Sequence, residues 1–158
     1  MAPDIATQLA LERLLARYVA SLDEDRLEEW PDFFTEDCRY QIISAENYEQ
    51  NLPIGVFFAD SRGMLSDRVS ALRQANIYEA QRYRHLVSST LILDASDGIV
   101  TARSNYLVVR IMHDGATALF SSGRYLDRVS FRGPEPLFLE KLVLFDSRRI
   151  DTLLAIPL

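Results

Sequence analysis

Residues 99–131, IVTARSNYLVVRIMHDGATALFSSGRYLDRVSF, predict more of the fold than any other part of the chain. Two runs rich in β-branched and aromatic residues, 99–112 and 117–131, flank the tetrapeptide HDGA. An Asp-Gly pair between two such runs is typical of a tight β-hairpin. We therefore expect two long antiparallel strands joined by a short turn.

The same pattern recurs on both sides of this hairpin. A strand is expected at about 83–94, before the turn segment DASDG, and another at 136–146, after the turn segment RGPEP. Short turns between consecutive strands mean that neighbours pair antiparallel. Because twist accumulates along strands of this length, the sheet should curl into a cone.

The N-terminal third of the chain predicts helices. Four large residues recur at spacings of four, three and four, and so share one helical face: Leu11, Leu15, Tyr18 and Leu22. Asp4 is a suitable N-cap for this first helix. Its side chain can accept a hydrogen bond from a free N–H of the first turn.

The segment after the first helix is less regular. A second short helix is expected at about 24–34, where Pro31 marks a kink or an early end. A short strand should follow at 38–42, and residues 44–59 are expected to form a loop. A third helix is expected at about 60–76.

Helices first and strands afterwards indicate the α+β class. We expect a single cone-shaped domain over residues 1–158, with helices within 4–76 packed on a long curved antiparallel sheet mainly within 83–146. An apolar tail covers 150–158, and five of its last eight residues are Leu, Ile or Ala. Such a tail should be buried, either in its own cone or against a neighbouring subunit.

Composition excludes several classes of function. A net charge of −6 and a pI near 4.9 argue against nucleic acid or an anionic membrane as the main partner. Acids and an arginine interrupt the first fifteen residues, where a signal peptide would need an unbroken apolar region, so no signal peptide is expected. No apolar run approaches the length needed to span a membrane. The single cysteine, Cys38, excludes an internal disulfide, so a cytoplasmic location is expected.

The number and positions of the possible ligands argue against a metal centre, because one cysteine is too few for a Rieske cluster and the two histidines are not expected to converge on one ion. A Rieske cluster needs two cysteines and two histidines, and a mononuclear non-haem iron needs two histidines and a carboxylate. The only histidines are His85, near the start of a strand, and His113, in the predicted hairpin turn. Cys38 is expected to be buried and inert.

Acid–base chemistry inside the cone is the alternative that remains. A stand-alone isomerase or dehydratase would use a carboxylate or histidine with tyrosines in an apolar cavity. Five residues could point inward: Tyr18, Asp23, Tyr40, His85 and Asn105. Asp23 has a simpler explanation as the cap of the second helix. A binding or scaffold protein without redox partners is a third class.

The stretch QRYRH at 81–85 favours an interaction role. Arg82, Tyr83, Arg84 and His85 place cations and an aromatic ring at a helix-to-sheet junction, and Arg and Tyr are enriched at interface hot spots. The chain has sixteen arginines and one lysine, which reflects either codon bias or the use of arginine in desolvated ion pairs. A solvated polar edge is the plain alternative for this stretch.

Several stretches together resemble the small (beta) subunit of Rieske-type aromatic-ring-hydroxylating dioxygenases. They lie in family order: LDEDRLEEWPDFFTEDCRY (22–40), FADSRGMLSDRVSALRQANIYEAQRYRHLVSS (58–89), SGRYLDRV (122–129) and LFDSRRIDTLLAIPL (144–158). The similarity is greatest to members that act on terephthalate, and members acting on anthranilate, salicylate or other aromatic carboxylates are alternatives. None of the four is a catalytic motif.

The resemblance implies a nuclear-transport-factor-2-like (ketosteroid-isomerase-like) cone and an α3β3 hexamer built on a trimer of beta subunits. In such an assembly the catalytic alpha subunit holds the Rieske [2Fe-2S] cluster and the mononuclear non-haem iron, and a separate reductase supplies electrons from NAD(P)H. It implies no cofactor, metal or catalytic residue in this chain. The interface candidates are Arg82, Tyr83, Arg84, His85, Arg148, Arg149, Leu153, Leu154, Ile156 and Leu158.

Overall fold

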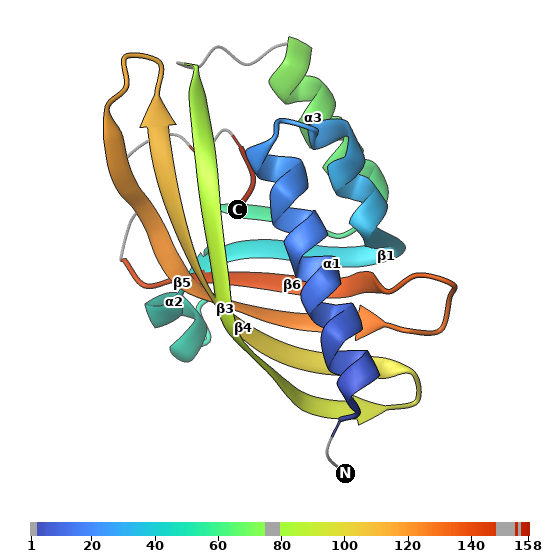
Figure 1. Ribbon diagram of the computed structural model, residues 1–158. Helices are drawn as coiled ribbons and strands as arrows, with labels where there is room; N and C mark the ends of the chain where they lie inside the picture. The colour runs from blue at the N-terminus through green and yellow to red at the C-terminus, as the bar shows by residue number, and fades with distance from the viewer. Residues whose placement is uncertain (1–2, 75–79, 148–153, 155) are drawn as a thin grey trace.

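The structure is a computed structural model, and it describes residues 3–74, 80–147, 154 and 156–158. Its helices pack against a single curved sheet (Figure 1). In chain order the elements are α1 (Ile5–Asp23), the 3-10 helix η1 (Leu27–Phe33), β1 (Phe34–Ser44), α2 (Ala45–Glu49), β2 (Phe57–Ala59), α3 (Arg62–Gln74), β3 (Gln81–Ser96), β4 (Ile99–Met112), β5 (Thr117–Ser130) and β6 (Leu137–Phe145).

The sheet has the strand order β2-β1-β6-β5-β4-β3. Strands β3 to β6 pair antiparallel with their neighbours in sequence, which confirms the predicted meander. The parallel pairing of β1 with β6 was not predicted, since it joins segments from opposite ends of the chain. With helices on a long curved sheet, the α+β cone is confirmed.

Two turns join the strands as their sequences indicate. Asp97 and Gly98, with φ of 54° and 75°, form the two-residue connection between β3 and β4. Positive φ at both positions is typical of the turn that matches strand twist. In the predicted HDGA hairpin, Gly115 has φ of 92°, and the N–H of Met112 donates to the carbonyl of Ala116 at 2.9 Å.

Curvature of the sheet comes from bulges and one close approach. The register of β3 on β4 shifts between Ser88 and Leu91, where Ser89 has φ of 55°. On β5, a Cβ added to Gly123 would lie 1.9 Å from the carbonyl oxygen of Leu144. Only glycine lets β5 and β6 approach this closely. Figure 1 shows the resulting curved sheet with α1 across it.

Two of the expected elements were wrong in detail. The segment predicted as a helix at 24–34 is the 3-10 helix η1, with Pro31 inside it. Residues 44–59 are not simply a loop, because they contain α2 and the edge strand β2. Strand β2 has only three residues and forms by pairing with β1, so its own sequence is too short to show a period.

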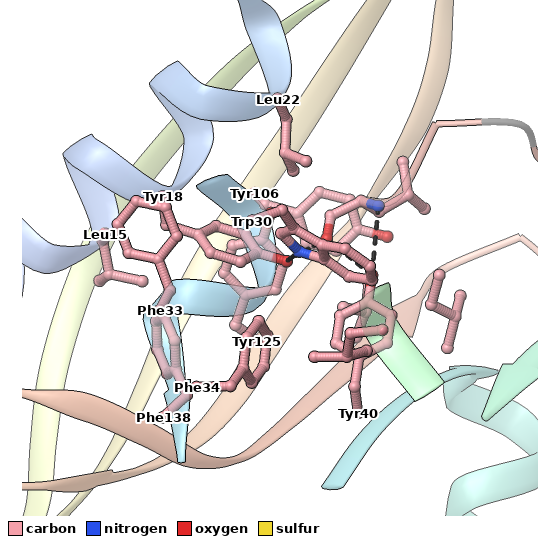
Figure 2. Close-up of a cluster of buried hydrophobic side chains, with 14 of the residues drawn as sticks. Leu15, Tyr18, Leu22, Trp30, Phe33, Phe34, Tyr40, Tyr106, Tyr125 and Phe138 are labelled. Carbon is pink, nitrogen blue, oxygen red and sulfur yellow. Dashed lines mark hydrogen bonds between the residues drawn. The ribbon is translucent and has the colours of Figure 1, made fainter. Parts of the chain in front are cut away.

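The core is centred on Tyr18, one of the four residues predicted to line one face of α1, all of which are buried. Its ring meets four others edge-on, at centroid distances of 5.4 to 6.4 Å (Figure 2): Phe33, Phe34, Tyr125 and Phe138. Asp4 caps α1 as predicted, because its Oδ1 accepts the N–H of Thr7 at 2.6 Å.

Candidate functional site

The four candidates at the start of β3 divide between the two faces of the sheet. Tyr83 and His85 are only 2% and 6% exposed, whereas Arg82 and Arg84 are exposed. This alternation follows from the two-residue period of a strand. Arg82 and Arg84 are therefore the two that can meet another protein directly, and the interface role of all four stays a prediction.

His85 is bound by Asp23, the last residue of α1. Asp23 Oδ1 lies 2.6 Å from His85 Nδ1, and Asp23 Oδ2 accepts the main-chain N–H of His85 at 2.9 Å. The expectation that Asp23 caps the second helix was wrong, since its carboxylate is engaged on β3 and η1 has no side-chain cap. The side chains of Asp23 and His85 are 5% and 0% exposed, so the imidazole is closed from solvent and the carboxylate is largely shielded.

The Asp23–His85 pair fastens a helix to a strand. A pocket of about 390 Å³ lies beside it and is lined by Asp23, Arg82, Tyr83 and Arg84 among others, but not by His85. Within the described part of the chain, His85 Nε2 has no hydrogen-bond partner. A general base must come within hydrogen-bond reach of a substrate, and a fully buried imidazole does not.

Aromatic side chains fill the interior where an acid–base enzyme would need a cavity. Trp30, Phe34 and Tyr40 are fully buried, and Phe33 is 7% exposed. The cavity beside Tyr40 has a volume of only about 10 Å³, which leaves room for about one water molecule at most. The arrangement of the described residues therefore disfavours a stand-alone isomerase or dehydratase.

A second polar pair lies deep in the core. Lys141 Nζ is 3.1 and 3.2 Å from the carboxylate oxygens of Asp127, and the side chains are 0% and 1% exposed. The Nζ atom also lies 3.6 to 4.6 Å from the ring centroids of Tyr125, Phe138 and Tyr18. Burial raises the pKa of Asp127 and lowers that of Lys141, while their mutual attraction opposes both shifts.

The described apolar residues of the tail are buried in the cone of their own chain. Leu154, Ile156 and Leu158 are at most 6% exposed. Of the two alternatives for the tail, burial in its own cone therefore holds at these three positions. Three further interface candidates, Arg148, Arg149 and Leu153, lie outside the described residues.

A wide hollow lies on the surface, at the edge formed by β1 and β2. It has a volume of about 640 Å³ and is lined in part by five side chains that are 40% to 70% exposed: Tyr48, Leu52, Ile54, Val56 and Phe58. We term these five residues the β2-edge patch. The guanidinium of Arg39 lies 5.5 Å from the ring centroid of Phe58. An exposed apolar patch beside a cation is typical of an interaction surface.

The described residues do not form a metal centre. Among the described residues, no three His, Cys, Asp or Glu side chains are grouped so as to hold an ion. Cys38 is buried as predicted, and burial raises the pKa of its thiol, so it is not activated. No helix in the described ranges is long and apolar enough to cross a membrane.

Sequence reasoning missed both buried pairs. Asp23 and His85 lie 62 positions apart, and no local pattern in the sequence indicates that they interact. Lys141 carried a usable signal, because a lone lysine inside the run LFLEKLVLF sits on the inward face of a strand. A lysine at such a position needs a buried acid as its partner.

Both the sequence and the fold of this chain are similar to those of known proteins. The family model described as "Ring hydroxylating beta subunit" matches residues 17–152. The small subunit of anthranilate 1,2-dioxygenase from Burkholderia cepacia is 42% identical over 156 residues, which cover 98% of this chain and 96% of that protein.

Two further proteins support the same grouping. Subunit beta 2 of the terminal oxygenase component of terephthalate 1,2-dioxygenase, from a Comamonas species, is 42% identical and covers 90% of this chain and 93% of its own length. A crystal structure from Novosphingobium aromaticivorans, assigned as the beta subunit of an aromatic-ring-hydroxylating dioxygenase, superposes with a TM-score of 0.89 at 39% identity. The match covers 97% of each chain.

Proposed function

Because the chain belongs to the family of ring-hydroxylating beta subunits, and is the small subunit of an aromatic-ring-hydroxylating dioxygenase, we propose that it acts without catalytic residues of its own. Its role is to bind and support a catalytic large subunit. The observation that carries this proposal is the filled interior, in which aromatic rings occupy the place of a substrate cavity and the imidazole of His85 is fully buried.

The redox groups belong to the large subunit in this proposal. One cysteine is too few for a Rieske [2Fe-2S] cluster. A mononuclear non-haem iron needs two histidines and a carboxylate grouped together, and the described residues contain no such group. The large subunit would hold both, and a separate reductase would pass electrons to them from NAD(P)H. The whole assembly would work in the cytoplasm.

The proposed assembly is an α3β3 hexamer, in which residues 1–158 act as one cone-shaped unit. The β2-edge patch and the exposed Arg82 and Arg84 are the surfaces we assign to subunit contacts. Tyr83 and His85 would support these arginines from the inward face of β3. Arg148, Arg149 and Leu153 remain candidates on sequence grounds alone.

The proposed substrate class of the assembly is an aromatic carboxylate, such as terephthalate, that is dihydroxylated on the ring. Two relatives support this class, since they are named for anthranilate and terephthalate and are equally similar, at 42% identity. Both compounds carry a carboxylate on a benzene ring. The choice among such acids would lie in the active site of the large subunit.

Co-expression with the large subunit of a ring-hydroxylating dioxygenase from the same organism tests the proposal. The tagged chain alone should be colourless and iron-free, and with the large subunit it should purify as a brown complex. Ile54→Asp in the β2-edge patch should reduce recovery of the large subunit, whereas Ile5→Asp should not, although Ile5 is also exposed on the surface. Turnover of an aromatic acid by the isolated chain would contradict the proposal, as would failure of the two subunits to associate.

A further inference from the structure

Two tyrosine hydroxyls converge on one oxygen atom in the middle of the cone. Tyr18 Oη and Tyr40 Oη each donate to the main-chain oxygen of Leu158, both at 2.9 Å. All three residues are 0% exposed. The two tyrosines belong to different elements, Tyr18 to α1 and Tyr40 to β1, and both are labelled in Figure 2.

The other contacts of these hydroxyls fix the direction in which they donate. Trp30 Nε1 donates to Tyr18 Oη at 3.2 Å, and the main-chain N–H of Leu158 donates to Tyr40 Oη at 3.2 Å. A hydroxyl has one proton, so each hydroxyl proton is directed to the Leu158 oxygen. Burial raises the pKa of both tyrosines well above the ordinary value, which keeps them protonated.

The oxygen that the two tyrosines bind belongs to the tail, and not to a strand or helix of the cone. Arg68 Nη2 on α3 donates to the carbonyl of Leu154 at 2.6 Å, and Leu154, Ile156 and Leu158 are buried. The described tail residues lie outside the helices and strands. Without Leu158, two buried O–H groups would lack their acceptor, which is costly in an apolar interior.

We propose that the cone contains a binding site for a small apolar molecule with a carbonyl or carboxylate oxygen, and that Leu158 is its tethered occupant. Tyr18 and Tyr40 bind the oxygen, and the surrounding aromatic rings and leucines contact the apolar part. The proposal does not depend on the large subunit, because every group in it belongs to this chain.

A variant that lacks Leu158, made with a stop codon at that position, tests the proposal. The probes are 4-methylpentanamide and 4-methylpentanoate, which match the leucine side chain and carry a neutral or a charged oxygen. Trp30 is the only tryptophan and contacts Tyr18, so its fluorescence reports binding. At least one probe should give a saturable change and raise the melting temperature of the variant, with no such effect on the full-length chain.

Recognition of the oxygen is tested separately in the shortened chain. Tyr40→Phe should weaken probe binding roughly five- to tenfold. Tyr106→Phe is the matched control, because Tyr106 is buried but its hydroxyl pairs with Ser121 at 2.9 Å. Equal affinity in both variants would overturn the role of the tyrosine pair, and equal binding to the full-length chain would overturn the role of Leu158.

If the shortened chain does not fold by itself, probe binding is measured through its effect on refolding. A molecule that binds only the folded state shifts the folding equilibrium toward it in proportion to its concentration. In that case a probe should restore the folded-state fluorescence of Trp30 and the circular dichroism of the full-length chain. If neither probe binds or restores folding, no site of this kind exists.

Discussion

Asp23, the last residue of α1, binds both the main-chain N–H and the imidazole Nδ1 of His85 on β3. The two carboxylate oxygens take one donor each, at 2.9 and 2.6 Å. A charged acceptor shielded from solvent makes stronger hydrogen bonds than a neutral one. The pair therefore joins the helical layer to the sheet directly beneath the exposed Arg82 and Arg84.

Asp23→Asn should lower the free energy of unfolding by about 1.5–3 kcal/mol, because hydrogen bonds to a charged group are lost. Chemical denaturation of the purified chain measures this change. Asp32→Asn is the control, since Asp32 is an exposed acid in η1 and its replacement should have little effect. Equal stabilities of the two variants would show that the Asp23–His85 contact does not hold α1 on the sheet.

Replacement of His85 should reveal which ring nitrogen matters. The side-chain N–H of an asparagine can occupy the place of Nδ1, whereas that of a glutamine reaches toward the place of Nε2. Since Asp23 binds Nδ1 at 2.6 Å, His85→Asn should be less destabilised than His85→Gln in thermal unfolding. The reverse order would indicate that Nε2 makes the important contact.

Replacing one partner of the buried Lys141–Asp127 ion pair should destabilise the chain more than replacing both partners with apolar residues. Lys141→Met leaves an unpaired carboxylate in the core and should destabilise the chain by about 3–5 kcal/mol. The double variant Lys141→Met with Asp127→Leu should recover most of that loss. A double-mutant cycle of unfolding free energies measures the coupling, and additive costs would contradict a direct interaction between the two side chains.

The Lys141→Met variant should also have a characteristic dependence on pH. Burial already raises the pKa of Asp127, and loss of the lysine removes the group that lowers it. A carboxyl whose pKa is raised by folding binds a proton more tightly in the folded state, so stability increases as the pH falls toward its ordinary range. Stability that instead falls as the pH is lowered through this window would contradict an unpaired Asp127.

Charge reversal at Arg82 and Arg84 should weaken binding of the large subunit without unfolding the chain. Both side chains are exposed on the outward face of β3, so Arg82→Glu with Arg84→Glu leaves the core intact. Recovery of the large subunit on the tagged chain and the melting temperature are measured together. Arg13→Glu, at an exposed position of α1, is the matched control. If the double variant recovered the large subunit normally, this part of β3 would be a solvated polar edge with no role in subunit binding.

Much of the fold was predictable because local patterns specify it. The Asp-Gly hairpins, the strand runs and the apolar face around Tyr18 each signal their element within a few residues. The pairing of β1 with β6 was not predictable in this way, since it depends on contacts between distant segments. The same holds for β2, whose three residues form a strand only when β1 is beside them.

The candidate site was predictable only in part. Strand alternation in QRYRH already separates Arg82 and Arg84 from Tyr83 and His85, yet only the structure shows which pair faces inward. The partner of His85 could not be inferred, because Asp23 lies on another element and has an alternative use as a helix cap. Leu158 was expected to be buried, but its contacts with Tyr18 and Tyr40 depend on the assembled cone.

The most direct test of the central claim is the distribution of iron between separated subunits. The large subunit and the tagged chain are co-purified, separated under conditions that retain bound metal, and analysed for iron and inorganic sulfide. All of the iron and sulfide should remain with the large subunit, and re-mixing with this chain should restore oxygenase activity. Iron in this chain, or full activity of the large subunit in its absence, would contradict its role as the non-catalytic supporting subunit.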